Sequence, residues 1–263
     1  MSEKRRTRRK QLDASHQRNW LTGRHAVTEM LRAGVWPFTR LVGTDDVLGS
    51  LADELAVVPD WPGVAAVIEP EPSHRVTELC GSRHHQGLAA QMGPFPYRSL
   101  EQLPSLLADR SSDLPPLVVI CDRIQDGHNL GAILRNCDAM AVDAVVMWER
   151  EQIGIVPQVA RSSAGAVNHL PIIRVDNLNV ATDRIAGLGL QIFAASEKSK
   201  IPVWEVDAQQ PTAVVIGSEA HGVDDALLSR CSQQIAIPMR GQVASLNAAV
   251  AAGMILYELR RKV

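Results

Sequence analysis

The chain has 263 residues, of which 46% are hydrophobic and 21% charged, and its formal net charge is -2 at pH 7. This length and apolar fraction allow a sizeable core and two modest domains. The longest nearly apolar stretch, residues 248–257, is too short to span a bilayer. The basic N-terminus is not followed by an apolar signal region. We therefore expect a cytoplasmic protein. The four cysteines form no Cys-x-x-Cys pair, so we expect neither a disulfide framework nor a metal.

Positive charge is concentrated in residues 1–18. Seven lysines and arginines stand there against two acidic residues, so this segment carries +5 and the rest of the chain -7. Such a polar segment is predicted to be a disordered tail when free. In an otherwise acidic chain, a basic arm favours binding to a polyanion such as RNA, and a solubilising tail without a specific partner is the alternative.

Residues 19–93 form a predicted N-terminal domain. Apolar residues at positions 26, 27, 30 and 31 have helical spacing, and Gly34 is a typical helix stop. The segment 94–116 contains five prolines and is predicted to be a linker with one short helix.

Residues 117–263 alternate strand and helix patterns. Short β-branched runs at 117–121, 213–216 and 234–237 are typical of buried parallel strands. The same reading predicts further strands at 143–148, 169–174 and 190–194, and helices that begin at about 129 and cover 157–165, 178–187 and 245–259. This alternation predicts an α/β fold in which a mostly parallel sheet carries helices on both faces.

Small or polar residues follow each of the three β-branched runs. Asn129 precedes a predicted helix that it can cap, and Arg135 lies in the second turn of that helix. The second run leads into Gly217–Gly222, and the third leads into residues 238–247. Taken singly, a cap or a turn is the commoner use of such residues. Because ligands bind at the carboxyl ends of parallel strands, we expect the three segments to form one site.

Together, in this order and at these spacings, residues 129–135, 217–222 and 237–247 resemble the three motifs of the SpoU (TrmH) family of RNA ribose 2'-O-methyltransferases, which belongs to the SPOUT class. The resemblance covers residues 117–263, and a weaker similarity covers most of the N-terminal part. It implies a C-terminal trefoil knot, a homodimer, S-adenosylmethionine as the cofactor, and transfer of a methyl group to a ribose 2'-hydroxyl of RNA.

The resemblance also implies roles for individual residues. Arg135 matches the arginine that acts on the 2'-hydroxyl, with Asn129 orienting it and Glu219 orienting the site. Because a guanidinium keeps its charge, we expect Arg135 to bind phosphate and stabilise the developing alkoxide; the alternative is a surface ion pair with Asp138. The expected catalytic residues are Arg135, Asn129, Glu219, Ser245 and Asn247, and the expected cofactor-binding residues are Gly217, Ile237, Leu246 and Ser245.

Both ends of the N-terminal domain resemble the small substrate-binding domain that precedes the catalytic domain in the ribosomal-RNA branch of the family. The RNA-contact candidates are therefore Arg24, His25, Arg83, His84 and Gln86, and solvated side chains at a domain edge are the alternative. This domain favours a guanosine of large-subunit (23S-type) ribosomal RNA as the target. A tRNA guanosine, or a non-catalytic RNA-binding or ribosome-assembly factor of the same fold, remains open.

Overall fold

The computed structural model describes residues 19–55, 64, 67–110, 113–261 and 263. The basic segment 1–18, predicted to be a disordered tail, lies outside these described residues. The chain divides into two compact units: one contains the residues up to Pro96 together with Ile155–Asn168, and the other contains Tyr97–Gly154 and His169–Val263. Residues 155–168 thus group with the first unit, although the sequence pattern placed them in the C-terminal half.

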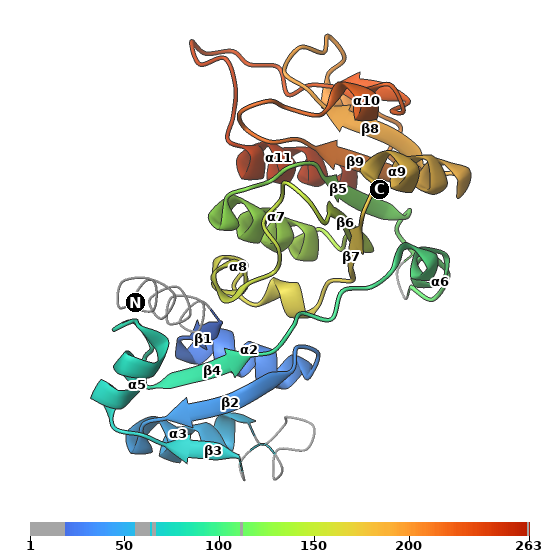
Figure 1. Cartoon of the computed structure of the whole chain (residues 1–263). Coiled ribbons are helices and arrows are strands. Elements are labelled where there is room, and N and C mark those ends of the chain that lie inside the picture. Colours follow the sequence, from blue (N-terminus) through green and yellow to red (C-terminus); the bar gives the residue numbers. More distant parts are fainter. Residues whose placement is uncertain (1–18, 56–63, 65–66, 111–112, 262) are drawn as a thin grey trace, which may run out of the picture. The chain divides into compact units, whose positions relative to one another are not determined.

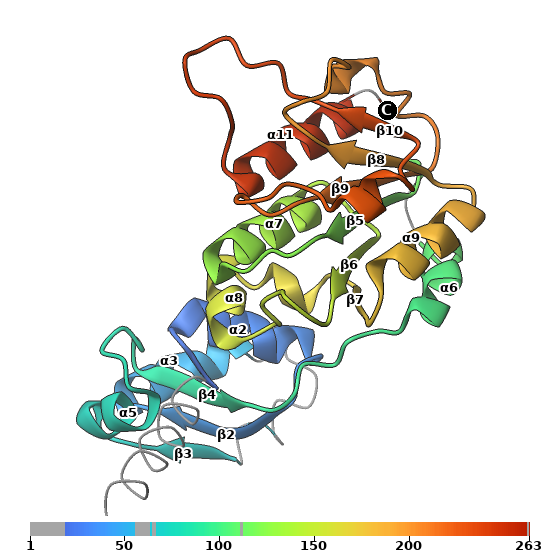
Figure 2. The ribbon, with the colours of Figure 1, turned by 45° about the horizontal axis from the view of Figure 1, so that its top comes forward.

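The first unit is built on a four-stranded sheet in the order β1-β4-β2-β3. Strand β4 is antiparallel to β1 and β2, and β3 is parallel to β2. The strands are β1 (Trp20–Thr22), β2 (Phe38–Gly43), β3 (Ile68–Pro70) and β4 (Leu88–Met92), and the helices are α2 (Arg24–Ala33), α3 (Asp45–Leu55), α5 (Ser73–Cys80), α8 (Pro157–Ser162) and a 3-10 turn, Ala166–Asn168. Helices α2 and α3 lie on one face of this sheet and α5 on the other (Figure 2).

Side chains that alternate along the strands form the core of the first unit. Trp20, Val42 and Ala89 cluster with Val76 and Cys80 of α5, whereas their strand neighbours point to the opposite face. Helix α2 ends as predicted from its glycine: Gly34 follows it with φ 62°, a left-handed conformation that glycine adopts at low cost.

The second unit contains a six-stranded sheet in the order β10-β8-β9-β5-β6-β7, and all its strand pairs are parallel. The strands are β5 (Leu117–Cys121), β6 (Ala144–Trp148), β7 (Ile172–Val175), β8 (Gln191–Ala195), β9 (Thr212–Ile216) and β10 (Gln233–Ile235). The helices are α6 (Leu103–Ala108), α7 (Gly127–Ala139), α9 (Leu178–Gly187), α10 (Asp225–Leu228) and α11 (Ala248–Arg261), with 3-10 turns at Leu100–Gln102 and Val203–Glu205.

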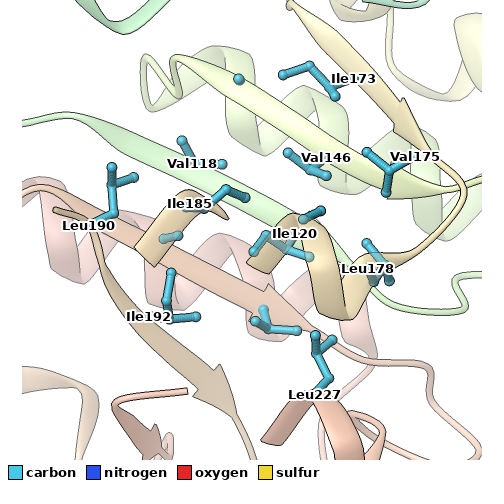
Figure 3. Close-up of a cluster of buried hydrophobic side chains, with 14 of the residues drawn as sticks. Val118, Ile120, Val146, Ile173, Val175, Leu178, Ile185, Leu190, Ile192 and Leu227 are labelled. Carbon is cyan, nitrogen blue, oxygen red and sulfur yellow. The ribbon is translucent and has the colours of Figure 1, made fainter. Parts of the chain in front are cut away.

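Helices cover both faces of this parallel sheet. On one face, Leu178 and Ile185 of α9 pack over Val118, Ile120 and Val146 in one apolar cluster (Figure 3). Helices α7 and α11 lie side by side on the other (Figure 1). The predicted α/β class is therefore confirmed. Among the described residues, no helix is long and apolar enough to cross a membrane.

Strand order reverses between β5 and β9. The chain proceeds from β5 through β6 to β7 on one side, and β9, β8 and β10 lie on the other. The carboxyl ends of β5 and β9 are consequently neighbours, and the Asp122 N–H donates to the Ile216 carbonyl at 2.9 Å. Open α/β sheets bind ligands at such a switch point, because the loops that leave it diverge and open a crevice.

Candidate functional site

A buried carboxylate joins the loops that follow β5 and β9. Asp122 is only 2% exposed, and its Oδ2 accepts the Asp224 backbone N–H at 2.8 Å. The Arg123 side chain donates from Nε to Asp122 Oδ1 at 3.1 Å and also lies 3.6 Å from an Asp224 carboxylate oxygen. A buried carboxylate with these partners is satisfied, so it fixes the two loops relative to each other.

Helix α7 begins two residues earlier than its predicted start. Asp126 is the N-cap, and its carboxylate accepts the N–H groups of His128 and Asn129 at 2.9 Å each. The expectation that Asn129 caps this helix is therefore wrong, because the carboxylate of Asp126 already satisfies these donors and complements the helix dipole. The Asn129 side chain is left free for another contact.

That contact brings the three sequence motifs together. The side-chain amide of Asn247 donates to Asn129 Oδ1 at 2.9 Å and also to Glu219 Oε1. The same Asn247 caps α11, because its Oδ1 accepts the N–H groups of Ala249 and Val250 at 3.0 and 3.2 Å. One asparagine thus connects the start of α11 to the segments that follow β5 and β9.

Gly217 allows the loop after β9 to fold back on itself. A Cβ at this position would overlap the backbone of Gly222 and Val223. The Gly222 N–H donates to the Ser218 carbonyl at 2.8 Å, and Gly222 has φ 65°. Glycine is therefore required at 217 for the backbone turn itself.

The first pocket lies at the carboxyl ends of β8, β9 and β10 and has a volume of about 410 Å³. Its wall consists of Ala195–Lys198, Ile216–Gly222, Ala236, Ile237, Met239, Ser245–Ala248 and Ala251. All four residues expected to bind the cofactor are among them. The mixture of small apolar side chains, hydroxyls and two carboxylates is typical of a pocket for a small organic ligand.

The second pocket, of about 390 Å³, lies on the other side of the asparagine network. Its wall consists of Arg123–Asp126, Asn129, Glu151, Ser218–His221 and Ala248. The two pockets share Ser218–His221 and Ala248, so groups bound in them would meet beside Glu219. Within the described residues, no group of three or more His, Cys, Asp or Glu side chains could hold a metal.

Arg135 lies apart from this network. Its side chain is exposed on α7, and it lines neither pocket. In the part of the chain that the structure describes, Arg135 makes no hydrogen bond or ion pair, so the alternative of a surface pair with Asp138 is not formed. The helical period explains this separation. Asn136, seven residues after Asn129, lies on the same face of α7 as Asn129 and donates to the Ala249 carbonyl of α11 at 2.9 Å. Arg135 therefore lies on a different face of α7.

In the first unit, the expected RNA-contact residues gather at the N-terminus of α2. The Gln86 Oε1 accepts the Arg24 backbone N–H at 3.0 Å, so Gln86 has a structural role as a cap for α2. His25, Arg83 and His84 are exposed. These five residues come from two segments about 60 residues apart in sequence, and the Gln86 side chain brings the two segments into contact.

Three groups of residues near the site were not predicted. Residues Ala195–Lys198, after β8, line the first pocket, but the sequence there has no glycine or cap pattern that marks it. Asp122 and Arg123 hold together the loops that follow β5 and β9. In the sequence, they are marked only as a charged pair directly after a strand. His221 belongs to the predicted second motif, but no role was predicted for its side chain, which lines both pockets.

Comparisons with known proteins agree with this geometry. The sequence model of the SpoU rRNA Methylase family matches residues 116–257. A protein of Staphylococcus saprophyticus assigned to the TrmH family of tRNA/rRNA methyltransferases is 32% identical over 242 residues, which cover 92% of this chain and 95% of that protein.

Two solved structures are similar over nearly the whole chain. The SpoU methyltransferase AviRb from Streptomyces viridochromogenes, in complex with AdoMet, is 25% identical with a TM-score of 0.75, covering 92% of this chain and 89% of that one. An RNA 2'-O ribose methyltransferase is 27% identical with a TM-score of 0.69, covering 95% and 90%. The family match, the relative and the motif geometry lead to one conclusion: this chain belongs to the SpoU family of RNA methyltransferases.

Proposed function

We propose that this chain transfers a methyl group from S-adenosylmethionine to a ribose 2'-hydroxyl of RNA in the cytoplasm, and that its target is a guanosine of large-subunit (23S-type) ribosomal RNA. Its family membership makes this chain an S-adenosylmethionine-dependent RNA methyltransferase. The observation that carries the proposed transfer to a ribose hydroxyl is the network of Asn129, Glu219 and Asn247 between two pockets, one for a methyl donor and one for an acceptor nucleotide.

The first pocket fits S-adenosylmethionine. Its apolar wall of Ile216, Leu246 and Ala251 suits an adenine ring, and Ser196, Ser218 and Ser245 supply hydroxyls. The expected binding residues Gly217, Ile237, Leu246 and Ser245 would hold the cofactor through backbone groups and one hydroxyl. The Glu219 carboxylate would complement the positive sulfonium. When bound, the cofactor supplies an electrophilic methyl group.

The residues of the second pocket would position the acceptor ribose. Asn247, itself bonded to Asn129, holds the Glu219 carboxylate at the junction of the pockets, where this carboxylate can accept a hydrogen bond from a ribose hydroxyl. Arg135 remains charged at neutral pH, so it can bind an RNA phosphate and stabilise negative charge on the reacting oxygen, but it is a poor base. The catalytic set is thus Asn129, Glu219, Ser245, Asn247 and Arg135, with Arg135 supplied from the exposed side of α7.

A homodimer and a C-terminal knot form part of the proposal. Val250, Met254 and Tyr257 are 50%, 47% and 57% exposed and follow one another at helical spacing on α11. This apolar stripe supports contact with a second copy of the chain. Sedimentation at micromolar concentration should give the dimer mass for the wild-type chain and the monomer mass for Met254→Glu; a monomeric wild type would refute the dimer.

The choice of ribosomal RNA rests on the N-terminal unit and its exposed basic residues. Labelled methyl transfer to unmodified large-subunit ribosomal RNA and to unmodified tRNA, measured in parallel, tests it. We expect label on ribosomal RNA that is lost in Asn129→Ala and retained in Asn179→Ala, a control at a half-buried asparagine on α9 that lines neither pocket. Label on tRNA alone would select the tRNA enzyme, and cofactor binding without label on either RNA would select a non-catalytic binding factor.

A further inference from the structure

The arginines of the first unit differ in their partners. Arg32 pairs with Glu29 at 2.7 Å, and Arg75 pairs with Glu78 at 2.5 Å. Arg40 likewise pairs with a glutamate across neighbouring strands. Arg83 and Arg161, in contrast, have no carboxylate partner among the residues that the structure describes.

Contacts through residues 22 and 23 connect the segments that carry these two arginines, although 78 positions separate the arginines in the sequence. Arg161 of α8 donates from Nη1 to Thr22 Oγ1 at 3.2 Å. The next residue, Gly23, lies beside residues 84–86, which directly follow Arg83. A Cβ placed on Gly23 would be 3.4 Å from Gln86 Oε1 and 4.0 Å from the His84 carbonyl oxygen.

Arg161 is unusual because its charge is partly desolvated without compensation. Burial lowers the pKa of its guanidinium, although the group stays protonated at neutral pH. A hydroxyl partner neutralises no charge, so this partly exposed guanidinium has no anionic partner among the described residues and can still bind one. Its five N–H donors and planar shape suit the oxygens of a phosphate.

We propose that Arg161, Arg83, His84 and His25 form one phosphate-binding face of the first unit, and that this face binds the RNA backbone. The identity of the polyanion rests on the proposed function. Side chains of all four residues are exposed, and they come from α8, α2 and the loop after α5. The dipole of helix α2 adds to the positive potential at its N-terminus. The first turn of this helix contains no acidic residue that would cancel the potential. Arg161 is therefore an RNA-binding residue, although it stands in the sequence between the strands of the second unit.

Fluorescence anisotropy with a labelled, unmodified transcript of large-subunit ribosomal RNA tests this face, using the full chain over a range of KCl concentrations. We expect Arg161→Gln to weaken binding roughly tenfold and to reduce the slope of log Kd against log salt by about one. Arg75→Gln is the matched control, because Arg75 lies in the same unit but is already paired; its affinity should stay within about twofold.

A second variant separates phosphate binding from a structural role. Thr22→Val removes the hydrogen bond that positions Arg161 but keeps the charge, so RNA binding should change much less than in Arg161→Gln. Equal losses in both variants, unchanged affinity in Arg161→Gln, or no RNA binding by the wild-type chain would overturn the proposal.

The outcomes also separate this inference from the proposed function. RNA binding that depends on Arg161, in a chain that transfers no methyl group, would support the phosphate-binding face and refute the enzyme activity. Methyl transfer by Arg161→Gln with an unchanged KM for RNA would support the enzyme activity and refute the phosphate-binding face. Calorimetric binding of S-adenosylmethionine should be the same in Arg161→Gln and the wild type, because Arg161 does not line the first pocket.

Discussion

At the scale of single residues, Gly217 shows why glycine occurs in the second motif. The family resemblance implied that Gly217 binds the cofactor. The structure adds a reason that does not depend on any ligand, because the chain at Gly222 and Val223 occupies the space where a side chain would start. The turn that results lines the first pocket, so the packing and the proposed donor binding impose the same requirement.

Gly217→Ala should therefore impair both folding and donor binding. We expect a loss of about 1–3 kcal/mol in the free energy of unfolding, as for overpacking in a close-packed region, and at least tenfold weaker binding of S-adenosylmethionine. Urea unfolding and calorimetry measure the two effects. Gly241→Ala is the control, since nothing lies within 4 Å of a Cβ there. Normal cofactor binding by Gly217→Ala would contradict this explanation.

His85 fixes the conformation of the loop that carries Arg83 and His84. Its Nδ1 accepts the Gly87 N–H at 3.0 Å, so the proton of the neutral ring is on Nε2, which lies 3.1 Å from Thr77 Oγ1. Burial lowers the pKa of His85 below its usual value. Protonation of Nδ1 would remove the acceptor for Gly87.

Stability should consequently fall in mild acid. The folded-state pKa of His85 lies below the unfolded-state value of about 6.5, so the unfolded chain takes up the proton first as the pH decreases. The contribution of the neutral ring is complete above the unfolded-state pKa and is lost as the pH falls through the folded-state pKa. The stability difference between wild type and His85→Gln, measured by urea unfolding from pH 8 to pH 5, should shrink toward acid. A pH-independent stability difference would argue against this role of His85.

At the scale of helices and strands, the sequence predicted elements best where periodicity decides them. Strand β5 and helix α9 have the bounds that the pattern predicted. Helix α7 begins earlier than predicted, because Asp126 and Asn129 are both good caps and only the folded loop decides between them. Helix α11 begins at Ala248 rather than 245, because Asn247 caps it. Boundaries depend on such competing local contacts, which periodicity does not report.

Asn247 has two separable roles at the start of α11. Asn247→Ala loses the cap and the network, and should cost about 1 kcal/mol of stability and most of the methyl transfer. Asn247→Asp keeps a capping oxygen but places a carboxylate beside Glu219, so it should retain stability and lose transfer. Thermal unfolding and a methyl-transfer assay distinguish the two. Full activity in Asn247→Asp would show that only the cap matters.

At the scale of the whole molecule, the strand order is what assembles the site. The sequence placed three motifs after three strands, and the reversal between β5 and β9 makes two of these strand ends neighbours. The long segment from β10 to α11 then returns the third motif to the same place (Figure 1). The loop after β8 and the contribution of Arg161 could not be predicted, because each depends on a contact between segments far apart in sequence.

The proposed methyl acceptor is a ribose 2'-hydroxyl of RNA. The most direct test transfers labelled methyl from S-adenosylmethionine to unmodified ribosomal RNA and then hydrolyses the product with alkali, which needs a free 2'-hydroxyl to cleave the neighbouring phosphodiester. We predict that the label appears in alkali-resistant dinucleotides that contain guanosine, and that Glu219→Ala abolishes it. Label recovered in mononucleotides would mean methylation of a base and would contradict the proposed function.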